Sequence, residues 1–237
     1  YFSVFHSISA FCNAGFSTLP DVLREEGLRF NYPLQLVIAS LFIIGGTGFA
    51  LIHNIFRFIL RWYHNFKNRL LYRKAITFKP WVLTFNSKLI SWITGILLVF
   101  GTLVCFALGF NHSLAEHPTI GGKIATAFFT GAAPRTARFN TVDLARLAFP
   151  TLLVMMFLMW IGGSPGSTAG GIKTTTFAIG ALNIFNLARG QGSIQVLRRE
   201  VSHQSVRRAF AIISLSIFSL GLAIFLLAIT DGDKGLL

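Results

Sequence analysis

Charged residues are scarce in this 237-residue chain: they make up 12% of it, and only 8 residues are acidic. A typical soluble domain is about one quarter charged, so a soluble globular enzyme is not expected. The sequence has only two cysteines, Cys12 and Cys105, which we interpret as small apolar packing residues rather than a disulfide. Its 25 phenylalanines and long apolar runs exclude a disordered chain.

Four stretches contain no charged residue: 30–56, 89–115, 147–172 and 209–230. Each exceeds the roughly 18–20 residues that a helix needs to cross about 30 Å of hydrocarbon. The hydropathy pattern therefore predicts four membrane spans, each crossing once.

The formal net charge of +13 lies mainly in two linkers between these spans. Residues 53–88 contain only basic charges, and residues 186–209 contain several arginines against a single Glu200. The positive-inside rule places both linkers in the cytoplasm, where we expect contact with anionic lipid headgroups. Because no aromatic stacking surface accompanies the charges, nucleic acid is not a predicted partner.

Two apolar segments, Phe2–Cys12 and Gly122–Ala133, look helical but are too short to span, which is typical of re-entrant segments. They form an internal repeat, because a constant offset of 123 residues aligns Phe5/Phe128, Ala10/Ala133, Ala14/Ala137, Phe16/Phe139 and Thr18/Thr141. Two amphipathic hairpins at an interface are the alternative. The matched repeats favour a pore in which extended loops present backbone carbonyls to a dehydrated cation.

Each short segment is followed by a span that glycines interrupt, at Gly45-Gly46-Thr47-Gly48 in the first span. The longer, glycine-rich interruption lies in the third span, at Gly162-Gly163-Ser164-Pro165-Gly166-Ser167-Thr168-Ala169-Gly170-Gly171. This composition cannot stay helical, so we predict an irregular intramembrane loop. The alternative is close helix packing through the GxxxG spacing of its glycines. Lys173, just beyond the loop, could close an inner vestibule, pair with a cytoplasmic partner, or extend to the inner interface.

The sequence also lacks the common catalytic and cofactor-binding motifs. The sequence contains no HExxH pair, no phosphate-binding glycine loop and no GxSxG nucleophile motif. An enzyme is therefore not predicted, and neither is a cofactor.

The motifs together resemble the Trk/Ktr/HKT superfamily of potassium transporters and channels, over roughly residues 5–229. The run from Phe5 to Ser17 is similar to the second pore helix and filter of that family, and Arg135–Asp143 resembles the third filter. The stretch 162–173 is similar to the intramembrane loop that interrupts the third repeat's inner helix.

The resemblance implies an all-α membrane protein built from span, pore helix, filter loop and span repeats, with a glycine-rich broken inner helix. Residues 1–59 would be the second repeat's pore helix, filter and inner helix, and 89–187 a complete third repeat. Residues 60–88 and 188–208 would be cytoplasmic linkers, and 209–237 the first span of the next repeat.

Functional residues follow from the same resemblance. The expected filter comprises Asn13, Ala14, Gly15, Phe16, Thr136, Ala137, Arg138 and Phe139. Potassium would bind to carbonyls of Asn13, Ala14, Gly15, Thr136 and Ala137. The expected gate comprises Gly162, Gly163, Ser164, Pro165, Gly166, Ser167, Thr168, Gly170, Gly171 and Lys173.

The family likeness also implies a function and partners: potassium uptake through a gated pore, a homodimer in a bacterial inner membrane, and a cytosolic nucleotide-binding regulatory subunit. Two departures leave alternatives open. The first repeat and the fourth filter are absent, so we expect a piece of a longer protein. Arg138 stands where a filter glycine is expected, which leaves a sodium-permeable pore or a non-conducting scaffold or sensor as alternatives.

Overall fold

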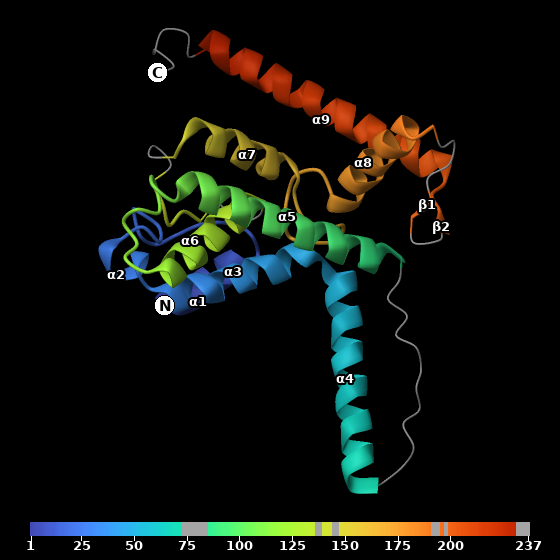
Figure 1. Ribbon diagram of the computed structural model, residues 1–237, viewed down its shortest axis with the longest axis horizontal. Coiled ribbons are helices and arrows are strands. Elements are labelled where there is room, and N and C mark those ends of the chain that lie inside the picture. Colours follow the sequence, from blue (N-terminus) through green and yellow to red (C-terminus); the bar gives the residue numbers. More distant parts are fainter. Residues whose placement is uncertain (73–84, 136–138, 144–146, 191–194, 197–198, 231–237) are drawn as a thin grey trace. The chain divides into compact units, whose positions relative to one another are not determined.

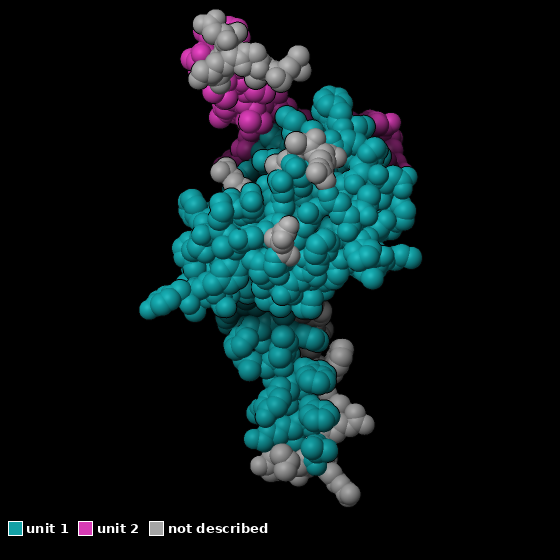
Figure 2. Space-filling model, turned by 90° about the vertical axis from the view of Figure 1, so that its left-hand side faces the viewer, with its two compact units in different colours: residues 1–174 teal, residues 175–237 magenta. Residues whose placement is uncertain are grey.

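The structure is a computed structural model. It describes all residues except 73–84, 136–138, 144–146, 191–194, 197–198 and 231–237 (Figure 1). The chain divides into two compact units, residues 1–174 and 175–237, which Figure 2 colours separately.

The first unit consists of helices joined by loops (Figure 1). Its elements are α1 (Phe2–Phe11), α2 (Glu26–Arg29), α3 (Tyr32–Thr47), α4 (Phe49–Tyr72), α5 (Phe85–Gly109), α6 (Ile120–Ala132), the 3₁₀ turn η1 (Ala133–Arg135) and α7 (Phe149–Trp160). The second unit comprises nearly all of α8 (Thr174–Ala188), a hairpin of β1 (Gln195–Val196) and β2 (Arg199–Glu200), and α9 (His203–Thr230). The predicted all-α class is confirmed; the hairpin adds only two strands of two residues each.

The helices differ in whether they are long enough to cross a membrane. Among the described residues, Ser87–Gly109 and His203–Thr230 are long and apolar enough. α7 has 12 residues and ends at Trp160, because the glycines that follow cannot continue it. The predicted crossings at 89–115 and 209–230 therefore coincide with single long helices, and the count of four crossings stays a prediction.

The first predicted span, residues 30–56, is divided by a sharp bend. Asn31 caps the start of α3, because its side chain accepts a hydrogen bond from the Leu34 amide. The helix ends before Gly48, which has a φ of 85°. The axes of α3 and the following helix differ by 107°. Beyond the bend α4 stays helical to Tyr72, so the first part of the predicted linker 60–88 is a helix.

Both short apolar segments are helices, as predicted: α1 and α6 each pack against α3. Their shared core contains Phe42 of α3 and Phe129 of α6, whose rings meet edge to face with centroids 5.6 Å apart. Ala10 of α1 and Ala132 of α6 are buried in the same cluster. Small residues in this core bring the two short helices close to α3.

A glycine pair sets the contact between α5 and α6. A methyl group at Gly131 would lie 2.5 Å from the carbonyl carbon of Gly101, so the two backbones touch. Without a hydrophobic driving force between helices in lipid, such close approach is what makes helix packing favourable. The long helix α5 thereby holds the short helix α6 in place.

We predict that Gly131→Ala destabilises the protein by about 1–3 kcal/mol, because the added methyl group must push two backbones apart. The matched control is Gly121→Ala in the same helix, where a methyl group would meet no atom within 4 Å. Thermal unfolding of the detergent-solubilised full-length protein measures both. Equal melting temperatures for the two variants would contradict the assignment of this contact.

Candidate functional site

The first predicted filter segment begins where α1 ends. Asn13 follows the helix with a φ of 54°, and the Ala14 amide donates to the Ser9 carbonyl at 2.9 Å. This is the Schellman ending of a helix, in which a left-handed residue turns the chain out of the helix. Gly15, with a φ of 72°, continues the turn. The chain from Asn13 to Ser17 thus leaves the helix and folds back beside it.

Three polar side chains hold this segment against α1. The Ser9 hydroxyl donates to the Phe16 carbonyl at 2.8 Å, and the Ser17 hydroxyl accepts from the Leu19 amide at 3.0 Å. His6 is 2% exposed; its Nε2 lies 3.1 Å from the Ser17 hydroxyl and its Nδ1 lies 2.9 Å from the Phe2 carbonyl. Because a carbonyl only accepts, Nδ1 donates to Phe2, and Nε2 is left to bond the Ser17 hydroxyl. Neither His6 nor Ser9 is among the site residues predicted from the sequence.

The second predicted filter segment follows α6 and η1. Thr136, Ala137 and Arg138 lie outside the described residues. Phe139 is 1% exposed, and its side chain belongs to the core cluster that also holds Ala10. Residues 139–142 run beside α6 in an irregular conformation.

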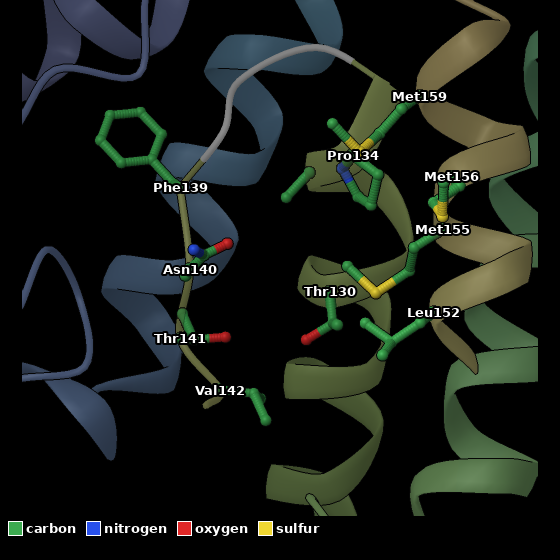
Figure 3. A pocket seen from close by; sticks show the side chains of 11 residues that line it. Thr130, Pro134, Phe139, Asn140, Thr141, Val142, Leu152, Met155, Met156 and Met159 are labelled. Atoms are coloured by element: carbon green, nitrogen blue, oxygen red, sulfur yellow. The ribbon is translucent and has the colours of Figure 1, made fainter. Parts of the chain in front are cut away.

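A cavity of about 250 Å³ lies behind residues 139–142, between that segment, α6 and α7 (Figure 3). Its lining is mostly apolar and includes Met155 and Met159 of α7. The hydroxyls of Thr130 and Thr141 are buried and have no hydrogen-bond partner among the described residues. Residues 139–142 therefore have free space on one side.

The second predicted filter segment contacts α1, the helix that precedes the first. The His6 ring, which supports the first segment, lies with its centroid 6.3 Å from that of Phe139 in the second. Further out, Arg24 pairs with Asp143 at 3.4 Å, joining the loops that follow the two segments. Two parts of the chain more than 100 residues apart in sequence thus lie in contact.

The glycine-rich stretch is an irregular loop rather than a packed GxxxG helix. Ile161 and Ile172 form an isolated parallel bridge at its base, and the Gly162 amide donates to the Ile172 carbonyl at 3.0 Å. A methyl group at Gly162 would lie 1.6 Å from the Gly170 carbonyl oxygen, so only glycine fits there. The Lys173 ammonium donates to the Ala169 carbonyl at 2.8 Å and closes the loop on its own backbone.

The loop is also bonded to the break between α3 and α4. The amides of Ser164 and Thr168 donate to the carbonyls of Gly46 and Gly45, at 3.0 and 3.3 Å. In return, the Phe49 amide donates to the Gly166 carbonyl at 3.2 Å. The gate residues predicted from sequence therefore lie against the end of α3 and the start of α4.

A polar cluster fixes the start of α6 on the opposite side of this unit. The Tyr32 hydroxyl lies 3.1 Å from Nδ1 of His117, which is 1% exposed, and Arg29 forms an ion pair with Glu116. Burial lowers the pKa of His117 below its ordinary value, and the positive charges of Arg29 and Lys123 lower it further. The cluster therefore favours neutral His117.

The chain is similar to several known cation transport proteins. The family model described as TrkH, cation transport protein, matches residues 2–234. The Ktr system potassium uptake protein B of Vibrio alginolyticus is 36% identical, over 98% of this chain and 47% of that protein. The potassium/sodium uptake protein NtpJ of Enterococcus hirae is 32% identical, over 98% of this chain and 47% of that protein.

A solved structure shares the fold. The crystal structure of the potassium transporter TrkH from Vibrio parahaemolyticus matches with a TM-score of 0.73 and 19% identity, over 97% of this chain and 45% of that chain. The chain thus spans about half the length of the curated relatives it matches.

We predict that stability falls as the pH drops through about 6.5, the ordinary pKa of histidine. The unfolded chain then takes up a proton at His117 that the folded chain resists, so the stabilisation present above this pH is lost. The slope due to His117 is at most about 1.4 kcal/mol per pH unit. In thermal unfolding between pH 5 and 8, His117→Gln should flatten the curve, and an unchanged slope would contradict this role.

Proposed function

The chain belongs to the TrkH family of cation transport proteins, and on that basis we propose that it supplies two filter segments and the gate of a pathway for potassium uptake across a membrane. One observation supports this proposal above the others. An irregular glycine-rich loop, which follows α7 where an inner helix would continue, is hydrogen-bonded to the end of α3 and the start of α4. Irregular backbone within a membrane is stable only when it is buried in protein or lines a water-filled path.

We propose that the carbonyls of Asn13, Ala14, Gly15, Thr136 and Ala137 replace the hydration shell of potassium. The Phe16 carbonyl already accepts a hydrogen bond from Ser9, so we place Phe16 at the edge of the ion site. Phe139 anchors its segment in the core through its side chain. Potassium is the transported ion, and we propose no resident cofactor.

The gate is proposed to be the loop 162–173. Its glycines allow the backbone to fold tightly, and its hydrogen bonds to Gly45 and Gly46 hold it in one position. Lys173, its last residue, adds a positive charge, which opposes the passage of a cation. Displacing the loop would lower this barrier.

The family establishes the general location of the chain, and its more specific location and its partners are proposed. The apolar helices and the family make the chain a membrane protein, and the family is one of transporters rather than enzymes. We propose that it lies in a bacterial inner membrane with its basic linkers in the cytoplasm, as a homodimer that binds a nucleotide-binding regulatory subunit. The exposed Arg57, Arg61 and Lys67 of α4 support a cytoplasmic surface that meets lipid headgroups or this subunit.

A second candidate function is uptake of sodium as well as potassium. The name of the Enterococcus relative refers to both ions. Arg138, at a position where the family resemblance leads us to expect glycine, also motivates this candidate.

We expect the full-length protein, reconstituted in liposomes, to show potassium flux well above that of choline. Carbonyl ligands of fixed spacing accept a dehydrated potassium ion, whereas choline is too large for them. Parallel sodium measurements decide between the two candidates. Absence of potassium flux, or equal flux of choline, would refute the proposed function.

We also expect Lys173→Met to raise basal potassium flux about two- to fivefold. The substitution removes the bond to the Ala169 carbonyl and the positive charge beside the gate. Lys67→Met is the control for loss of a positive charge, since Lys67 is exposed on α4. The same liposome assay measures both variants, and unchanged flux in Lys173→Met would count against the gate assignment.

A further inference from the structure

One side chain of the glycine-rich loop reaches the first filter segment. The hydroxyl of Thr168 accepts a hydrogen bond from the Asn13 side-chain amide at 2.6 Å and lies 3.1 Å from the Phe11 carbonyl, to which it donates. Phe11 is the last residue of α1, and Asn13 is the first residue of the segment. A single hydroxyl from the other repeat therefore bridges the end of the pore helix and the start of the filter.

The backbone conformation of Asn13 is one that depends on contacts with its surroundings. Among the described residues other than glycine, only Asn13 and Val22 have positive φ, and for Asn13 it is 54°. A residue with a side chain adopts this left-handed conformation at a cost in free energy, so it persists when its surroundings hold it. The Asn13 carbonyl direction depends on that conformation.

Thr168 is itself held in place by the backbone. Its amide donates to the Gly45 carbonyl at 3.3 Å, so its position is tied to the end of α3. The Phe11 carbonyl touches the same point, because a methyl group at Gly45 would lie 2.0 Å from the Phe11 oxygen. The end of α1, the end of α3 and the loop thus meet around one hydroxyl.

We propose that Thr168 is a positioning residue for the filter: through Asn13 it sets how well the first segment distinguishes potassium from sodium. The loop then has two roles: it blocks the ion path, and it also orders the carbonyls of the first filter segment. This inference rests on the proposed function, because it assumes that the carbonyls of Asn13 to Gly15 bind the transported ion. A loop that only blocks the path would change flux without changing selectivity.

The test is Thr168→Val in the full-length protein, which keeps the side-chain shape and removes the hydroxyl. We expect the potassium-to-sodium flux ratio in liposomes to fall about five- to tenfold, since two hydrogen bonds at the filter are lost. Thr168→Ser, which retains the hydroxyl, should restore the ratio to within about twofold of the wild type. Should the valine variant fail to fold, Thr168→Ala removes the same hydroxyl without the branched side chain.

Thr102→Val is the matched control, because the Thr102 hydroxyl bonds only back to Leu98 in its own helix in the described structure. Its flux ratio should equal that of the wild type. Asn13→Ala combined with Thr168→Val should lower the ratio no further than the larger single effect, since both changes remove the same bond.

The outcomes separate the two proposals. A potassium-selective wild type together with an unchanged ratio in Thr168→Val would overturn the positioning role and leave the proposed function intact. Additive effects of the Asn13 and Thr168 changes would overturn it as well. A wild type without potassium flux would overturn the proposed function, and this inference with it.

Discussion

The structure of the first unit depends on how backbone groups are paired where its helices stop. α3 ends at a glycine break, and the last carbonyls of a helix have no partner within it. In a membrane, each such group left unpaired costs several kcal/mol. Here the carbonyls of Gly45 and Gly46 accept amides of the loop 162–173, and the loop's Gly166 carbonyl accepts the Phe49 amide. The break after α3 and the break after α7 supply hydrogen-bond partners to each other. Without the other break, the backbone groups of each would be left unpaired at these bonds.

The two filter segments are supported unequally. The first is held by side-chain hydrogen bonds from Ser9 and His6 and by the left-handed Asn13. The described part of the second segment relies on the buried ring of Phe139 instead. His6 of α1 lies beside that ring and also bonds Ser17, so α1 contacts both segments.

Sequence reasoning was most successful where local composition decides the structure. Apolar runs of limited length predicted α1 and α6, and adjacent glycines predicted that residues 162–173 leave the helix. Glycines 45–48 likewise predicted a break in the first span, although not its angle of 107°. The support given by His6 was not predicted, because it depends on contacts with residues distant in the sequence. The bond between Thr168 and Asn13 joins residues 155 positions apart, and no spacing in the chain indicates it. The predicted filter residues 136–138 lie outside the described structure.

The cavity beside residues 139–142 has a mechanical consequence. Protein interiors are normally packed as densely as organic crystals, so they resist deformation. A segment with about 250 Å³ of space on one side is compliant in that direction, and two hydroxyls that line this space have no partner in the described part of the chain. It can yield to a larger side chain or a displaced backbone without straining the helices around it. We therefore expect larger side chains to be tolerated better behind the second segment than where the first lies against α1 and the loop.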